Sequence, residues 1–599
     1  MKTINTTNII STVNAINAVN TVNTVNTVNT VNAVNTVNTV NTVNTVNTVN
    51  TVNTVNAVNT VNTVNTVNTV NTVNTVNAVN TVNTISTVNT VNTVNTGNTG
   101  NTGNTGNTGN TRNTVNTVNT VNTVNTVNTV NTINTVNTIN TINGTNRNNP
   151  VLKWTDPKSL EGQLDFSLPS TGLTNEELVN VAKRVIEFSV KTGHPRFVNQ
   201  LFSTVDPYGF AGQLLTDALN PSVYTYEVSP VFSLMEEEVL KEMRRIVGYT
   251  NGEGDGLFCP GGSMANGYAI NIARHSKFPE IKEEGQHEQL QIFTSEDAHY
   301  SVKKLAAFLG IGTRNVIAIP VDEKGKMKVS ELEREIEKSL DSGRKPFMVS
   351  ATAGTTVIGA FDPLVDIAQI CRKYDLWFHV DAAWGGGALM SKKYRFLLEG
   401  VELADSVTWN PHKLLAAPQQ CSTLLLRRKG LLKSAHQSQA SYLFQSDKFY
   451  DTSYDSGDKH IQCGRRADVL KFWFMWKAKG TSGLERHIDR VFELSRYFRD
   501  LISKRPGFEL ILEPECTNVC FYYLPPSIRN LHKTDQMREL QRIAPVVKER
   551  MMRKGSMMIG YQPLRNMPNF FRLVLQNSGL TEQDMHFFVE EIERLASDL

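Results

Sequence analysis

The chain of 599 residues is poor in cysteine, in long apolar runs and, over its first quarter, in charge. No stretch of about 18 consecutive apolar residues occurs, and the first residues lack the apolar core of a secretory signal, so we expect a cytoplasmic protein that does not enter a membrane. The six cysteines follow no disulfide framework, which suits a reducing compartment. Cys516 and Cys520 are close in sequence, but no histidine or second cysteine pair completes a metal site, and we predict none.

Residues 1–149 contain no acidic residue and form a low-complexity Asn-Thr-Val repeat with a period of three. This period matches neither a helix nor a strand with one apolar face, and valine at every third position supplies little surface to bury. We therefore predict a disordered tail, with a stacked β structure built from the triplets as the alternative. We expect catalysis to survive deletion of this segment.

Charge in the remaining chain is balanced. The repeat holds three of the 59 basic residues, which leaves 56 basic and 56 acidic residues in 150–599. This balance supplies no basic domain for nucleic acid and no polybasic patch for a membrane surface. We therefore expect neither nucleic acid nor a membrane as a partner.

The alternation of short apolar runs with helical patterns between about 256 and 427 predicts an α/β fold with a mainly parallel sheet covered by helices. Helical spacing recurs at 175–189, 233–247, 484–501 and 534–554. The predicted strands are 291–294, 316–319, 347–350, 377–380, 406–409, 423–426, 519–523 and 571–575. We divide the chain into the repeat (1–149), an N-terminal helical segment that makes dimer contacts (150–197), a large cofactor-binding domain (198–472) and a smaller C-terminal α+β domain (473–599).

Two motifs carry the strongest chemical signal. His379-Val-Asp-Ala-Ala-Trp384 ends an apolar strand, and Asn410-Pro-His-Lys413 follows the next one. A lysine that forms a Schiff base with the aldehyde of pyridoxal phosphate, and an aspartate that pairs with its pyridinium nitrogen, are what an enzyme using this cofactor needs. Lys413 and Asp381 are the candidates for these roles, and Ala383 and His412 within the same motifs complete the predicted cofactor contacts.

Weaker motifs gain meaning beside these two. Gly262 and Ser263 open a helix after a glycine-rich turn that could cradle a phosphate. His299 follows a strand and could stack on the cofactor ring, and Thr355 lies in a strand-end loop that could reach the ring. Arg572 stands inside an apolar strand, where an arginine needs an anion such as a substrate carboxylate. Taken alone, these features also fit an ordinary turn, a surface histidine and a structural ion pair.

Together these residues resemble the group II pyridoxal phosphate-dependent decarboxylases, over roughly residues 155–599. The resemblance implies a fold-type I homodimer with active sites at the subunit interface. It also implies that Lys413 forms the Schiff base, that His299 stacks on the ring and that Arg572 binds the α-carboxylate. Tyr442 lies in the segment that forms a mobile loop over the partner's active site in this family. It resembles the tyrosine that protonates Cα after carbon dioxide leaves.

The choice of substrate rests on four positions expected around the distal acid group, namely Gln200, Ser222, Tyr224 and Gln419. The Ser222 and Tyr224 pair resembles cysteine sulfinate decarboxylase and departs from glutamate decarboxylases. The stretch around Gln419 resembles insect aspartate 1-decarboxylases. We expect L-aspartate to β-alanine as the main reaction, with cysteine sulfinate to hypotaurine as the alternative and glutamate to GABA less favoured.

Two readings from other classes remain. An aminotransferase would share the Asp381 and Lys413 arrangement, and a keto-acid product would reveal it. A non-catalytic scaffold built around the repeat would bind no cofactor, and the yellow colour of the purified protein would exclude it. The ordered set of His299, Trp384 and Gln420-Cys-Ser422 disfavours an aminotransferase. The presence of Arg572 and Tyr442 in addition to Lys413 and Asp381 argues against a non-catalytic scaffold.

Overall fold

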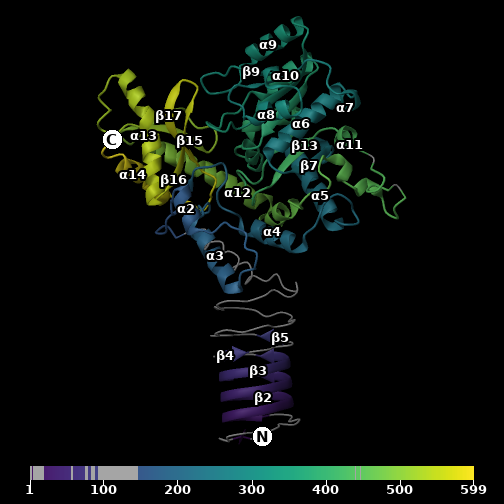
Figure 1. The fold of residues 1–599 in the computed structure, drawn as a ribbon, viewed down its shortest axis with the longest axis vertical. Coiled ribbons are helices and arrows are strands. Elements are labelled where there is room, and N and C mark those ends of the chain that lie inside the picture. The colour runs from purple at the N-terminus through teal and green to yellow at the C-terminus, as the bar shows by residue number, and fades with distance from the viewer. Residues whose placement is uncertain are drawn as a thin grey trace. The chain divides into compact units, whose positions relative to one another are not determined.

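The computed structural model describes residues 3–4, 19–55, 58–73, 79–82, 88–91, 146–438, 440–445 and 447–599. The chain divides into two compact units, Met1–Asn134 and Thr135–Leu599. The first unit is the repeat, and the second contains the sheets, helices and motifs discussed above (Figure 1).

The described part of the repeat is extended and paired in parallel. Its strands are β1 (Thr3–Ile4), β2 (Val19–Val55), β3 (Val58–Val73), β4 (Val79–Val82) and β5 (Val88–Val91). Val40 pairs with Val58 and Val70 with Val88, so each strand meets its neighbour 18 residues later. Because 18 residues are six triplets, valine faces valine and threonine faces threonine along the stack. In these segments the structure pairs equivalent triplets, and the rest of 1–145 lies outside the described residues.

The large sheet of the second unit has seven strands in the order β7-β13-β12-β11-β10-β8-β9. β13 runs antiparallel to both of its neighbours, and the other pairs are parallel, which confirms the predicted mainly parallel sheet. The strands are β7 (Asp255–Cys259), β8 (Leu290–Ser295), β9 (Val316–Ile319), β10 (Lys345–Thr352), β11 (Trp377–Ala382), β12 (Ser406–Trp409) and β13 (Ser422–Leu426).

Both faces of this sheet are buried, because successive side chains of a strand point to opposite faces and each face carries helices. Leu424 and Leu426 belong to one apolar core, whereas Leu425 between them belongs to the other. The first face is covered by α6 (Gly262–Lys277), α8 (Ser301–Phe308) and α11 (Leu431–His436). The second is covered by α5 (Pro230–Val247), α9 (Val329–Asp341), α10 (Leu364–Lys373) and the first half of α12 (Val469–Ser503).

A smaller sheet lies in the C-terminal part, in the order β14-β15-β17-β16-β6. Its strands are β14 (Phe508–Leu510), β15 (Asn518–Tyr523), β16 (Met558–Leu564), β17 (Met567–Val574) and β6 (Phe197–Val198). α13 (Lys533–Lys554) and α14 (Glu582–Leu595) pack on it and share its apolar core (Figure 1). The boundary expected at 197/198 falls inside β6, and the one at 472/473 falls inside the first turn of α12.

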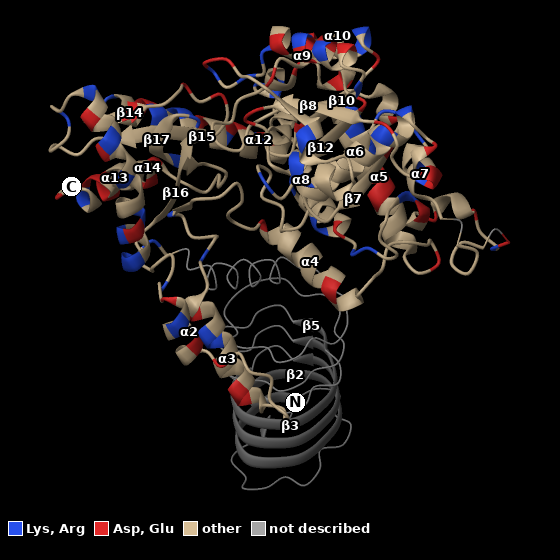
Figure 2. Cartoon of the chain, turned by 45° about the horizontal axis from the view of Figure 1, so that its top comes forward, with Lys and Arg blue, Asp and Glu red and all other residues tan. Residues whose placement is uncertain are grey.

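The remaining helices are α2 (Pro157–Gln163), α3 (Asn175–Phe188), α4 (Pro207–Leu219) and α7 (Ile281–Glu284). α3 begins where the sequence predicts it, because Thr174 and Glu177 form a capping box. Basic and acidic residues are mixed on helices such as α9 and α13 (Figure 2). Among the described residues, no helix is long and apolar enough to cross a membrane.

Candidate active site

A cavity of about 200 Å³ opens where β10, β11 and β12 end. In a parallel sheet this edge gathers the loops that follow several strands, so residues far apart in sequence meet there. Most of the predicted cofactor contacts line this cavity. They are Gly262, Ser263, His299, Asp381, Ala383, His412 and Lys413.

Lys413 stands in a turn directly after β12, where its backbone N–H donates to the oxygen of Asn410 at 3.0 Å. The side chain is half-buried and lines the cavity. Burial lowers the pKa of its amine, and the nearby Asp381 carboxylate acts in the opposite direction. A lowered pKa leaves more of the amine unprotonated, which is the form that attacks an aldehyde.

Asp381 is the last residue but one of β11 and is 6% exposed. Its carboxylate accepts hydrogen bonds from Nδ2 of Asn266 at 2.7 Å and from the backbone N–H of Ala383 at 3.1 Å. It forms no ion pair with any residue that the structure describes. A buried carboxylate in this state is suited to a cationic ligand in the cavity.

The start of α6 supplies a cradle for an anion. Gly261 has a φ of 93° and Gly262 is so close to Asn410 that an added Cβ would lie 2.5 Å from the Asn410 amide nitrogen. Glycine is therefore required where the turn enters the helix. Gly262 and Ser263, the first two residues of α6, line the cavity, and the first N–H groups of a helix have no partner within it.

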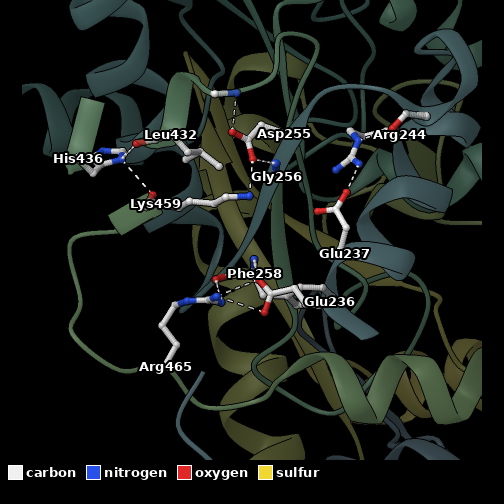
Figure 3. A network of polar contacts seen from close by, with 12 residues as sticks. Glu236, Glu237, Arg244, Asp255, Gly256, Phe258, Leu432, His436, Lys459 and Arg465 are labelled. Carbon is white, nitrogen blue, oxygen red and sulfur yellow. Dashed lines mark hydrogen bonds and ion pairs between the residues drawn. The ribbon is translucent and has the colours of Figure 1, made fainter. Parts of the chain in front are cut away.

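A buried ion pair holds β7 in place just before this turn. Arg465 Nη2 lies 3.0 Å from Glu236 Oε1, while Nη1 donates to the backbone oxygen of Phe258 at 3.1 Å (Figure 3). Glu236 in turn accepts the backbone N–H of Phe258 at 3.3 Å. Both backbone groups of Phe258 are thereby bound, which fixes the entry to the turn that carries Gly262 and Ser263.

The two histidines of the cavity are neutral groups at neutral pH. Burial lowers the pKa of His299, opposed by the Asp381 carboxylate, and its Nδ1 accepts the backbone N–H of Ser301 at 3.3 Å. Burial lowers the pKa of His412 to about 4, and its Nδ1 lies 2.8 Å from the backbone oxygen of Cys421. Neither ring therefore competes with Lys413 or a bound ligand as a cation.

Arg572 reaches the cavity wall from β17 of the other sheet. Its Nη1 donates to the backbone oxygen of Thr356 at 2.9 Å and its Nη2 to that of Asn199 at 3.3 Å, while Nε has no partner. Thr356 lines the cavity. The guanidinium is 8% exposed and pairs with no carboxylate in the described part of the chain. A buried guanidinium with a free donor is a receptor for an anion.

Seven predicted residues do not line this cavity, and Arg572, which reaches it only through the backbone of Thr356, is one of them. Thr355 is buried, but its hydroxyl accepts the backbone N–H of Ala360 at 3.0 Å, so it stabilises its own loop while Gly354 and Thr356 line the cavity instead. Tyr442 is 79% exposed. Gln200 and Gln419 are exposed, and Ser222 and Tyr224 are half-buried against the chain at Gly457 and Gly464.

Sequence reasoning missed several residues that the fold brings to the cavity. Asn266, Tyr300 and Asn410 line it, as does Trp384. Asn266 lies one helical turn after Gly262, so its position on the face of α6 that carries the cradle could have been inferred from helical spacing. Its bond to Asp381 joins residues 115 apart in sequence, which no local pattern contains.

This geometry agrees with the comparisons with known proteins. Residues 157–524 match the family described as the pyridoxal-dependent decarboxylase conserved domain. The chain belongs to this family. It is 55% identical over 456 residues to the acidic amino acid decarboxylase GADL1 of Xenopus tropicalis, covering 76% of this chain and 89% of that protein. It is 54% identical over 453 residues to the human cysteine sulfinic acid decarboxylase, covering 75% and 92% of the two chains.

A solved structure of mouse CSAD matches with a TM-score of 0.75 and 51% identity, over 78% of this chain and 99% of that one. The pyridoxal-dependent decarboxylase described here therefore has the fold-type I architecture and uses pyridoxal phosphate. The residues of the cavity fit this cofactor. The unpaired Asp381 carboxylate suits a protonated ring nitrogen, the start of α6 suits a phosphate and Lys413 is an amine of lowered pKa.

Proposed function

We propose that this enzyme removes the α-carboxylate of L-cysteine sulfinate and releases hypotaurine and carbon dioxide. The observation that carries the chemistry is that Lys413 and Asp381 share one cavity whose wall binds Arg572, a buried guanidinium without a carboxylate partner among the described residues. The substrate is supported by relatives named for cysteine sulfinic acid and acidic amino acids, and by the Ser222 and Tyr224 pair.

L-Aspartate is the second candidate, although the sequence alone favours it. That preference rests on the stretch around Gln419, whose side chain is exposed and does not line the cavity of its own chain. Aspartate and cysteine sulfinate both carry a short acidic side chain, so a site that binds one can accept the other. A relative named for cysteine sulfinic acid favours the sulfinate as the substrate.

Four residues of this chain have separate roles in the proposed reaction. Arg572 holds the α-carboxylate by charge-assisted hydrogen bonds and so sets which bond at Cα faces the cofactor. Bound pyridoxal phosphate supplies an electron sink for the pair left at Cα when carbon dioxide departs. Asp381 favours the protonated ring nitrogen, and Lys413 provides the amine that holds the cofactor between turnovers. Tyr442 gives a proton to Cα, with Lys413 as the alternative donor.

We infer a homodimer with shared active sites. No residue of α3 is buried, although it carries apolar residues at helical spacing; Leu178, Val181 and Val185 are 52%, 42% and 49% exposed. Tyr442 and Ser222 lie away from the cavity of their own chain. A second copy that covers the α3 face and contributes these residues to the first cavity explains both observations.

The substrate proposal is tested by a product assay with added pyridoxal phosphate. Cysteine sulfinate, aspartate and glutamate are offered separately at equal concentration, and the Lys413→Ala variant is the matched control. We expect hypotaurine to dominate and the variant to lose both turnover and the visible absorbance of the bound cofactor. Dominant β-alanine would overturn the sulfinate assignment but retain the chemistry, and turnover by Lys413→Ala would overturn the chemistry.

The shared site is tested by mixing two inactive variants, Lys413→Ala and Tyr442→Phe, under conditions that exchange subunits. If the tyrosine of one chain serves the lysine of another, mixed dimers contain one intact site and activity returns. The absence of recovery in a mixture whose subunits demonstrably exchange would contradict the proposal.

A further inference from the structure

A chain of hydrogen bonds leads through the buried interior to Asp381, and its last member, Asn266, lines the cavity. Trp377, His379 and Asp381 stand at alternate positions of β11 and so project from the same face of the sheet. His379 pairs in register with Ser406 of β12. The exposed fractions show that the whole chain is shielded from water: Trp377 1%, His379 0%, Ser406 0%, Asn266 2% and Asp381 6%.

Which atom donates in each hydrogen bond of this chain follows from the first donor, Trp377. Nε1 of Trp377 can only donate, and it does so to Oγ of Ser406 at 2.8 Å. Ser406 therefore has its single hydrogen for Nδ1 of His379, which lies 2.8 Å away. With Nδ1 accepting, the proton of a neutral imidazole is on Nε2.

The second half of the chain carries this direction to the carboxylate. Nε2 of His379 donates to Oδ1 of Asn266 at 3.2 Å. The amide of Asn266 is thereby oriented with its NH₂ group toward Asp381, to which Nδ2 donates at 2.7 Å. The same nitrogen donates to Oγ of Ser301 at 2.9 Å. A flipped amide would place an oxygen against the carboxylate and would remove the hydrogen bond that orients it.

The protonation of His379 agrees with this arrangement. Burial lowers the pKa of the ring to about 4, with Asp381 acting in the opposite direction. The ring is therefore uncharged at neutral pH and acts as a fixed donor and acceptor, so it orients Asn266 without neutralising Asp381 as an adjacent cation would.

We propose that His379 is a positioning residue that acts through Asn266 to hold the Asp381 carboxylate aimed into the cavity. Asp381 would there hold the ring nitrogen of the cofactor, and the relay from Trp377 through Ser406 and His379 would determine how firmly it does so. This role is independent of which amino acid is decarboxylated, because it concerns the bound cofactor alone.

The test measures cofactor binding to the enzyme stripped of its cofactor. Two ligands are compared by titration: pyridoxal phosphate, and the analogue in which the ring nitrogen is replaced by a C–H group. In His379→Phe, which removes both ring nitrogens of the histidine, we expect pyridoxal phosphate to bind about tenfold or more weakly, because Asn266 is no longer held with its NH₂ group toward Asp381. Binding of the analogue should change by less than about twofold, because it has no ring nitrogen for Asp381 to hold.

His379→Gln is the matched conservative variant, since a glutamine amide can accept from Ser406 and donate to Asn266. We expect it to restore most of the affinity for pyridoxal phosphate. If both ligands weaken equally in His379→Phe, the residue only packs the core and the proposal is wrong. Unchanged affinity for pyridoxal phosphate would also overturn it.

Ser406→Ala gives the same comparison if the phenylalanine variant fails to fold. It leaves the imidazole in place and removes only the hydroxyl that selects its tautomer. We expect a smaller weakening of the same kind, confined to the ligand with the ring nitrogen. If Ser406→Ala binds each ligand with the same affinity as the unmodified enzyme does, the relay is contradicted.

Discussion

Glu236 and Arg465 form an ion pair in which the two side chains are 9% and 4% exposed, and both also bind the backbone of Phe258 (Figure 3). Removing one partner of such a pair leaves an uncompensated buried charge. We expect Glu236→Gln to lower the free energy of unfolding by about 3–5 kcal/mol, measured by urea denaturation. The double variant Glu236→Leu with Arg465→Met removes the uncompensated charge and should recover part of this loss, but not all of it, because the backbone N–H and oxygen of Phe258 lose these partners. A double variant as unstable as the single one would contradict this account.

Arg572 is expected to act on the substrate and not on the cofactor. In Arg572→Gln, kcat/KM should fall by about 100-fold, because a hydrogen bond to a charged group contributes roughly 1.5–3 kcal/mol. The affinity for pyridoxal phosphate should be unchanged, since Lys413 and Asp381 remain. Arg572→Lys should be intermediate, because lysine keeps the charge but loses the planar pair of donors. Steady-state kinetics and a cofactor titration separate these outcomes.

Tyr442 should affect turnover without affecting folding. It is 79% exposed, so Tyr442→Phe removes one hydroxyl from the surface of its chain. We expect kcat to fall by about 100-fold or more, which is the usual contribution of a positioned proton donor. Tyr454, which is 49% exposed on the same segment, provides the control: Tyr454→Phe should retain full activity. Equal losses in both variants would point to a general disturbance of the segment.

Buried histidines should make the protein sensitive to acid. Burial lowers the pKa of His379, His412, His436 and His487 to about 4 and that of His460 to about 3. In the unfolded chain these rings take up protons near pH 6.5. Their contribution to stability is therefore complete above about pH 6.5 and is lost as the pH falls toward 4.

Urea unfolding at a series of pH values between 7.5 and 4.5 measures this dependence. Each histidine adds up to about 1.4 kcal/mol per pH unit to the slope within that window. The Nδ1 atom of His436 contacts the backbone oxygens of both Leu432 and Lys459. His436→Gln removes this ring and should reduce the slope by about that amount. A slope unchanged by this replacement would show that His436 titrates normally in the folded state.

The sequence predicts the large sheet well because its strands are short apolar runs between clear turns. The ranges 316–319 and 406–409 coincide with β9 and β12. It predicts only the second half of α12, since Gly480 looks like the end of a helix, whereas the structure holds this residue at a φ of 64° within a longer kinked element. The sequence also predicts β17 too short, because the start of the strand at Met567 lies before the continuous apolar run that marks it.

Some residues of the site could likewise be predicted from the sequence, and others could not. Lys413 and Asp381 could be recognised because their chemistry follows strand ends that the sequence marks clearly. The partners of Asp381 could not, since Asn266 reaches it from another element and only the fold brings them together. Thr355 was mistaken for a cavity residue because hydroxyl groups that stabilise a turn and those that bind a ligand look alike in sequence. In the proposed homodimer, Tyr442, Ser222 and Gln419 act in a cavity that involves a second chain, which a single sequence does not place.

The helix α12 packs against both sheets. Phe472 and Leu484 belong to one of the two cores of the large sheet, whereas Phe498 and Ile502 belong to the core of the smaller sheet. Loss of either of these cores would remove the packing contacts of half the helix and so destabilise the core at its other half. The two sheets are therefore not separate cooperative units, and residues 146–599 should melt in a single transition despite carrying several cores.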